Sequence, residues 1–309
     1  MPTPLPTADP GTRSLTPAAL AALRGLGLRA ERVVDGVLQG LHRSPHHGAS
    51  IEFAEHKAYA PGDDLRHLDW KVYARSDRDV IRKFEQETNL QATLVIDASA
   101  SMAYGAEGVL TKHDYASVFA VAVAQVLLRQ QDAVALVRFA DKVAETLPPR
   151  ARATQIPQLL ATLERGDVHG TTDLQAALHH VLGTQRRRGL VLIFSDFFGD
   201  HGLTAASVRH LTGRGHEVTL FSVLDGDELT LPFTEMTLFE GMETKARLLV
   251  EPALVRAAYL AQLARHRERI RSLALDAGAH HVELDTRVPP SDAVRAWLND
   301  RRARGPRGR

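Results

Sequence analysis

A short apolar run at residues 94–96 (L-V-I) constrains the fold of this chain more than any other stretch. A continuous apolar run that polar residues end is typical of a strand buried on both faces of a parallel sheet. The run stops at Asp97, and hydroxyl side chains follow at alternate positions, Ser99 and Ser101. Open α/β sheets bind their ligands at the carboxyl ends of strands. The stretch therefore predicts both a central strand and a polar site at its end.

A carboxylate and two hydroxyls are hard oxygen ligands, which suit a hard divalent cation such as Mg²⁺. The pattern D-x-S-x-S is weakly specific by itself, because average residue usage produces it in roughly one chain in ten of this length. The alternative is a serine-rich turn in which Asp97 or a serine caps the following helix. Residues 92–102 alone leave both interpretations open.

The remainder of the chain alternates strand and helix patterns, which predicts a parallel sheet covered by helices on both faces. A second fully apolar strand is expected at residues 190–194, and residues 94–96 are expected at the centre of the sheet. The fold class that we predict is α/β, doubly wound and mainly parallel. Further helices are expected at 114–130, 153–163, 173–182, 203–213, 251–277 and 291–300, and further strands at 133–139, 142–146, 217–223 and 281–284.

The α/β domain is expected to carry additions at both ends and one insertion. The insertion, near residues 225–250, is predicted to be a small β structure whose first short strand lies at 229–231. The predicted organisation is a disordered tail at 1–15, a helical N-terminal extension at 16–50, a segment at 51–90 packed on the core, the α/β domain at 91–300, and a solvated basic tail at 301–309.

Composition excludes several classes of function. The chain of 309 residues has no cysteine, which excludes disulfides, cysteine-ligated zinc, Fe–S clusters and thiol catalysis. A formal net charge of +1 gives no field that would attract nucleic acid or a membrane surface. The most apolar segment, 115–128, is too short for a membrane span and contains polar residues. Because the N-terminus also lacks the pattern of a signal peptide, we expect a cytoplasmic protein without a membrane span.

Two further fragments extend the candidate site. The loop at 170–172 (G-T-T) precedes a predicted helix and supplies a hydroxyl, and Asp196 ends the second apolar strand. If the two apolar strands are neighbours, Asp97 and Asp196 emerge side by side at one edge of the sheet. Mg²⁺ prefers near-octahedral oxygen coordination and tends to keep waters. We expect direct ligands from Ser99, Ser101 and Thr172, direct or water-mediated contacts from Asp97 and Asp196, and one position open to an outside ligand.

The order of these fragments resembles the metal-ion-dependent adhesion site of von Willebrand factor A domains, over roughly residues 91–223. The resemblance favours Thr172 over Thr171 as the ligand, since an acid and then an aliphatic residue follow it. It implies a Rossmann-like fold and bound Mg²⁺ or Mn²⁺, whose binding can depend on a partner's carboxylate. One departure is Asp196-Phe197, where many such domains have Asp-Gly, and the bulky ring is expected to change access to the metal.

A longer signature at residues 59–75, Y-x-P-G-D-D-L-R-x-x-D-W-x-x-Y-A-R, precedes F-E-x-E-T-N and D-A-S-x-S-M. It resembles the bacterial domain-of-unknown-function family fifty-eight, from about residue 52 to 284. Members carry a von Willebrand A-like domain and are commonly encoded beside MoxR-type AAA+ ATPases. Many also have two N-terminal membrane helices, which this sequence lacks. We predict a structural role, fastening the N-terminal region to the sheet, for the signature residues Asp63, Asp64, Arg66, Asp69 and Trp70.

These resemblances imply a non-catalytic interaction module rather than an enzyme. Its open metal position would accept an acidic residue of a client protein, and the module would work as an adaptor for a MoxR-type ATPase. The alternative is a Mg²⁺-dependent hydrolase of phosphoesters or peptides, but the sequence supplies no general base for it. Position 99 is Ser where dehalogenase-type phosphatases need a second Asp, and the chain has no G-x-S-x-G, H-E-x-x-H or Walker A motif.

Overall fold

The computed structural model describes residues 16–21, 24–42, 56–58, 80–82, 90–165, 167–199, 205–244 and 246–304. The chain divides into two units, one of residues 1–42 with 90–309 and one of residues 43–89. In the second unit the described residues form two short antiparallel strands, β1 (His56–Ala58) and β2 (Val80–Arg82). The predicted tail at 1–15 lies outside the described residues, as do the signature residues Asp63, Asp64, Arg66, Asp69 and Trp70.

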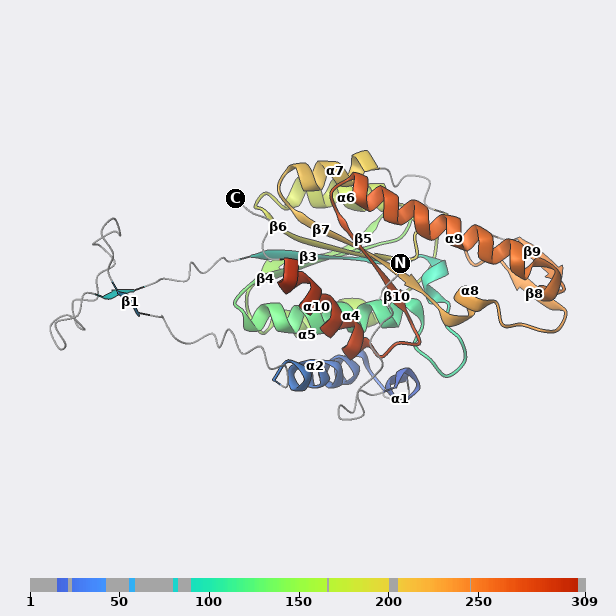
Figure 1. Ribbon diagram of the computed structural model, residues 1–309, viewed down its shortest axis with the longest axis horizontal. Helices are drawn as coiled ribbons and strands as arrows, with labels where there is room; N and C mark the ends of the chain where they lie inside the picture. The colour runs from blue at the N-terminus through green and yellow to red at the C-terminus, as the bar shows by residue number, and fades with distance from the viewer. Residues whose placement is uncertain are drawn as a thin grey trace. The chain divides into compact units, whose positions relative to one another are not determined.

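Six strands of the larger unit form one sheet in the order β10-β7-β6-β3-β4-β5 (Figure 1). Every neighbouring pair is parallel except β4 and β5, which are antiparallel at one edge. The strands are β3 (Gln91–Asp97), β4 (Ala133–Phe139), β5 (Val143–Arg150), β6 (Gly189–Ser195), β7 (Glu217–Leu224) and β10 (His280–Asp285). The doubly wound, mainly parallel α/β fold expected from the sequence is confirmed, with residues 94–96 in an interior strand.

Helices cover both faces of this sheet (Figure 1). One face carries α2 (Leu26–His42), α4 (Lys112–Arg129), α5 (Gln155–Arg165) and α10 (Pro290–Arg304). The other carries α6 (Leu174–Thr184), α7 (Ala205–Gly213) and α9 (Pro252–Asp276). Leu94 and Ile96 of β3 are buried on the first face and Val95 on the second. Because both faces are covered, the strand needs no polar residue at alternate positions.

The insertion after β7 begins with a short helix where a strand was expected. Residues 229–231, predicted as a strand, belong to or directly follow α8 (Gly226–Thr230). Asp225 and Glu228 form a capping box at its start, and this local hydrogen bonding outweighs the apolar pattern. The small β structure expected for the insertion follows as an antiparallel hairpin of β8 (Thr237–Glu240) and β9 (Arg247–Val250).

The two ends of the larger unit are helical. The chain turns at Gly25, whose φ of 86° separates α1 (Pro17–Ala21) from α2. Helix α2 packs on α4 and α10. Helix α10 continues to Arg304, so the first four residues of the predicted basic tail are helical, and Arg301 pairs with Glu217 at 2.9 Å. Residues 305–309 lie outside the described part.

No helix in the described part of the chain combines the length and the apolar character needed to cross a membrane.

Candidate functional site

The candidate site lies at the carboxyl ends of β3 and β6, where the winding of the sheet reverses. The chain leaves β3 for β4 on one side and returns to β6 on the other. The crevice between such strands is the usual ligand site of a doubly wound sheet. Because β3 and β6 are parallel neighbours, paired from Gln91 with Gly189 to Ile96 with Phe194, Asp97 and Asp196 leave the sheet at the same edge.

Backbone hydrogen bonds hold the loop that contains Thr172 against the end of β3. The amide of His169 donates to the carbonyl of Ala98, and the amide of Ala100 donates to the carbonyl of Gly170, both at 3.0 Å. This places Thr172 Oγ1 3.5 Å from Asp97 Oδ2. The loop and the strand end are therefore brought together although 75 residues separate them in the sequence.

Asp97 is fully buried and accepts hydrogen bonds from neutral donors. Its Oδ1 accepts from the amide of Ser99 at 2.8 Å, and its Oδ2 accepts from the hydroxyl of Ser195 at 2.5 Å. Burial, with the nearby charge of Asp196, raises the pKa of Asp97 to about 7. Sequence reasoning missed Ser195, although its hydroxyl directly precedes Asp196 at the end of an otherwise apolar strand.

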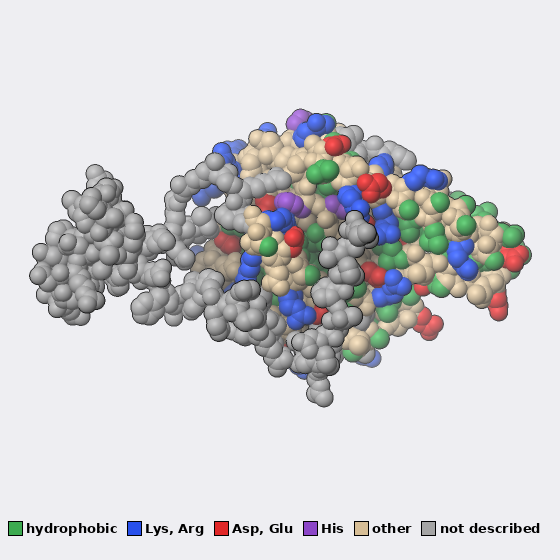
Figure 2. Space-filling model, viewed as in Figure 1, with side chains coloured by type: hydrophobic (Ala, Val, Ile, Leu, Met, Phe, Trp, Pro, Cys, Tyr) green, Lys and Arg blue, Asp and Glu red, His purple; other side chains and the backbone are tan. Residues whose placement is uncertain are grey.

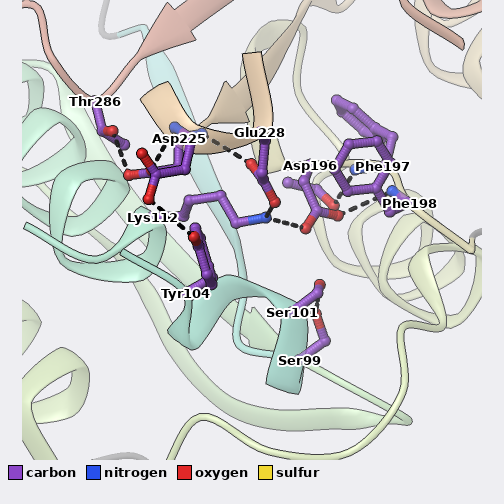
Figure 3. Close-up of polar contacts among 12 residues, drawn as sticks. Ser99, Ser101, Tyr104, Lys112, Asp196, Phe197, Phe198, Asp225, Glu228 and Thr286 are labelled. Atoms are coloured by element: carbon purple, nitrogen blue, oxygen red, sulfur yellow. Dashed lines mark hydrogen bonds and ion pairs between the residues drawn. The ribbon is translucent and has the colours of Figure 1, made fainter. Parts of the chain in front are cut away.

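Ser99 and Ser101 lie on the turn that follows β3. Ser99 is buried in an extended conformation just before the short 3-10 helix η2 (Ala100–Ala103). Its Oγ is 3.2 Å from the Oγ of Ser101, and Figure 3 shows Ser101 pointing toward the Asp196 carboxylate. Both hydroxyls thus face the side of the site to which Asp97 and Asp196 contribute.

Asp196 has a cationic partner that sequence reasoning did not find. Lys112 Nζ lies 2.7 Å from Asp196 Oδ2 and 2.6 Å from Glu228 Oε1 (Figure 3). Burial would lower the pKa of Lys112, but the two carboxylates outweigh it, and its pKa is raised. The sequence signal was weak, since Lys112 begins the most apolar helix, two residues before the expected start.

The two phenylalanines after Asp196 point in different directions. Phe197 has a left-handed backbone, with φ of 58°, and its ring is fully buried in the core beneath α6, α7 and α9. The ring, which was expected to change access to the metal, is therefore part of the core, and its backbone conformation is one that glycine adopts without strain. Phe198 instead donates its amide to Asp196 Oδ1 at 2.9 Å and packs its ring 4.8 Å from that of His266.

A carboxylate from the insertion also reaches the site. Thr172 Oγ1 lies 3.3 Å from Oε1 of Glu243, which is in the turn of the β8–β9 hairpin. Beside it is a hollow of about 390 Å³ whose lining includes Ser101, Phe198 and several hairpin residues. The insertion is thus part of the candidate site, and this contribution was not predicted from the sequence.

The residues at this edge fit a hard divalent cation. Asp97, Ser99, Ser101 and Thr172 are linked by contacts between their own oxygen atoms and the Ser99 amide. No three His, Cys, Asp or Glu side chains in the described ranges are grouped so that they could hold a metal. A cation here would thus depend on the hydroxyls, and oxygen-only ligands favour Mg²⁺ or Mn²⁺. Asp196, already engaged by Lys112 and an amide, is suited to act through water.

Solved structures with a similar fold are distant in sequence. An aerotolerance-related membrane protein from Bacteroides fragilis is 15% identical, with a TM-score of 0.46 over 69% of this chain and 100% of its own. The conserved hypothetical protein BatB from Bacteroides thetaiotaomicron is 13% identical, with a TM-score of 0.42 over 68% of this chain and 98% of its own. The SpRpn10 VWA domain is 12% identical, with a TM-score of 0.39 over 66% and 93%.

Relatives that are similar in sequence match a larger share of the chain than these solved structures do. Uncharacterized protein Rv1480 of Mycobacterium tuberculosis is 30% identical over 290 residues, which make up 92% of this chain and 88% of the relative. Uncharacterized protein Mb1516 of Mycobacterium bovis matches equally well over the same shares. The family described as protein of unknown function DUF58 matches residues 55–269, which include all five candidate ligands. The chain therefore belongs to the DUF58 family.

Proposed function

We propose that this chain is a non-catalytic protein-interaction module that depends on a divalent metal ion. The observation that carries the proposal is the convergence of Asp97, Ser99, Ser101 and Thr172 at the switch point of the sheet. These side chains come from two loops and share only hard oxygen chemistry, so a common cation explains their grouping.

In this proposal Mg²⁺ or Mn²⁺ is held directly by the hydroxyls of Ser99, Ser101 and Thr172. Asp97 and Asp196 contact the ion directly or through water. The ion supplies positive charge at an exposed edge, where an acidic residue of a partner protein can complete its coordination. Binding of the metal depends in part on that partner, because each added carboxylate strengthens the site.

Exposed apolar surface near the site supports protein binding. Figure 2 shows hydrophobic side chains gathered over the end of the unit that α9 and the β8–β9 hairpin form. Leu248 and Leu249 of β9 are 61% and 64% exposed, and Leu254 of α9 is 77% exposed. Apolar side chains grouped at the surface commonly mark interaction sites. A partner that presents its acid to the metal would find contact area beside it.

The partner that we propose is a MoxR-type AAA+ ATPase, together with a client protein that presents an acidic residue. The support is the family resemblance alone, which implies such a partner because members are commonly encoded beside MoxR-type ATPases. The chain would then act in the cytoplasm as an adaptor in the ATP-driven assembly or maturation of a protein complex, without binding nucleic acid.

A hydrolase that uses a metal-bound water would need a general base close to the hydroxyl ligands. His266 reaches this region, but its Nε2 lies 3.3 Å from the backbone carbonyl of Asp196. Lys112 is engaged by two carboxylates. Neither of these two groups is free to accept a proton, so a hydrolase would have to take its base from the carboxylates that the proposal uses as metal ligands.

The proposal is tested by capture of a MoxR-type ATPase and its client with and without Mg²⁺. Ser101→Ala removes one hydroxyl ligand and should abolish the Mg²⁺-dependent capture while the melting temperature stays unchanged. Ser272→Ala, at an exposed position on α9, is the matched control and should behave as wild type. The same proteins are assayed on phosphoesters and peptides. If the protein shows metal-dependent turnover and Ser101→Ala abolishes it, the hydrolase, and not the adaptor, is the correct function.

A further inference from the structure

The β8–β9 hairpin is held beside the candidate metal site by contacts along the segment that leads into it. Arg256 of α9 donates to the carbonyls of Leu231 and Phe233, at 3.0 and 2.7 Å. The ring of Phe233 then packs 5.6 Å from that of Phe239 in β8. The turn itself is closed by the Gly241 amide, which donates to the carbonyl of Ala246 at 2.8 Å. The position of the turn is therefore built into the fold.

Glu243 of this turn lies between the two loops that carry the candidate ligands. Its Oε1 is 3.3 Å from Thr172 Oγ1, in the loop after Gly170. Its Oε2 would lie 3.7 Å from a Cβ atom added at Gly199, in the loop after Asp196. Glu243 is half-buried, and no ion pair to it is found within the described ranges. Among the described residues, therefore, no protein cation balances this carboxylate beside the acidic site.

The hydroxyl of Thr172 cannot satisfy both carboxylates that flank it. Its Oγ1 is 3.3 Å from Glu243 and 3.5 Å from Asp97 Oδ2, but a hydroxyl has a single proton to donate. A cation bound to the lone pairs of Oγ1 would instead attract both carboxylates at once. The arrangement has the form of a metal site with acids on two sides of one hydroxyl ligand.

We propose that Glu243 is an intramolecular ligand of this metal, and that it takes the coordination position which an outside acid would otherwise fill. The inference rests on the proposed function and deepens it, since it names what regulates access to the ion. A partner's acidic residue must displace Glu243, so the hairpin acts as a built-in competitor. Binding of the partner then requires the turn around residues 241–244 to move away from Thr172.

The test measures Mn²⁺ binding and the number of water molecules on the bound ion. Calorimetry gives the affinity, and water-proton relaxation gives the hydration, for wild type, Glu243→Gln and Glu240→Gln. Glu240, on the same hairpin, is paired with Arg247 at 2.8 Å and is 55% exposed, so its variant controls for the lost charge. Removing a ligand should weaken Mn²⁺ binding about tenfold or more. Water should take the freed position, so relaxation should increase and then fall when acetate is added.

Each outcome distinguishes the inference from the function on which it rests. Weaker binding and higher hydration in Glu243→Gln alone support it, as does a response to acetate that wild type lacks. If Glu243→Gln and wild type agree in both measurements while Asp97→Asn loses the metal, the site stands and the role of Glu243 is wrong. If wild type and Glu243→Gln bind no Mn²⁺ even when acetate is present to stand in for a partner's carboxylate, both the inference and the proposed metal site are overturned.

Discussion

The ammonium group of Lys112 lies 2.7 Å from Asp196 Oδ2, and both side chains are at most 1% exposed. An ion pair this deeply buried is costly to separate, because each charge has lost its water. The pair also changes the charge of the site, because the Lys112 ammonium, which Asp196 shares with Glu228, offsets part of the Asp196 charge before a metal arrives. Asp196 therefore has less charge to offer the ion than the sequence suggested, and Glu243 is placed to supply negative charge beside Asp97.

Replacing Lys112 with Met should destabilise the protein by about 3–5 kcal/mol, because Asp196 and Glu228 are then buried without their cation. Urea unfolding measures the loss. Arg271→Met is the matched control, because Arg271 and its partner Glu268 are 61% and 63% exposed, and it should change stability by less than about 1 kcal/mol. The double variant Lys112→Met/Asp196→Asn should recover part of the loss. Equal effects of Lys112→Met and Arg271→Met would contradict the importance of the buried pair.

The central strand and its polar end could be predicted because they depend on local patterns. Burial on both faces requires an unbroken apolar run, and residues 94–96 and 190–194 provide it. The parallel pairing of these strands then places Asp97 beside Asp196. The full strand order, in contrast, was not predicted, because the alternation of strands and helices does not determine it.

The contributions of Lys112, Glu228 and Glu243 could not be predicted, because each depends on tertiary placement. Lys112 stands 84 residues before Asp196, and no local pattern shows that its side chain turns toward the sheet edge. The helix that carries Glu228 was expected to be a strand, since the capping box was not recognised in an apolar stretch. Glu243 was placed only within the small β insertion expected near residues 225–250.

Lower pH should destabilise the protein through His113. This side chain is 4% exposed and its Nε2 has no hydrogen-bond partner in the described part of the chain. Burial lowers the pKa of His113 to about 4, while Asp114 and Arg138 act in opposite directions. Since the folded pKa lies below the unfolded value of about 6.5, the stability is present above pH 6.5 and is lost as the pH falls toward 4.

Comparison of unfolding free energies at pH 7 and pH 4 isolates this contribution. Wild type should lose up to about 3 kcal/mol more than His113→Leu, because the variant has no imidazole to protonate. His210→Leu, at an exposed position on α7, should follow wild type. An identical loss in wild type and His113→Leu would show that other groups cause the acid sensitivity.

At position 197 a glycine substitution should leave the protein more stable than an alanine substitution, which reverses the usual order. Its ring is fully buried, so removing it should cost about 3–5 kcal/mol. Its φ of 58° lies in the left-handed region, where alanine is strained and glycine is not. Phe197→Gly should therefore be more stable than Phe197→Ala by about 1 kcal/mol. Chemical denaturation of both variants measures the difference, and a less stable glycine variant would argue against a left-handed backbone at this position.

Mg²⁺ should stabilise the folded protein through Asp97. An ion that binds only the folded state adds about 2.7 kcal/mol at a concentration one hundred times its Kd, which corresponds to a rise in Tm of about 4–5 °C for a chain of this size. Asp97→Asn keeps the shape of the side chain but removes the negative charge that faces the hydroxyls, so its Tm should not respond to Mg²⁺. Asp276→Asn, at the exposed end of α9, serves as the control and should respond like wild type. Thermal unfolding with Mg²⁺, and again after chelation, completes the comparison. An equal rise in Tm for wild type and Asp97→Asn would mean that the ion binds elsewhere and that the carboxyl end of β3 is not the metal site.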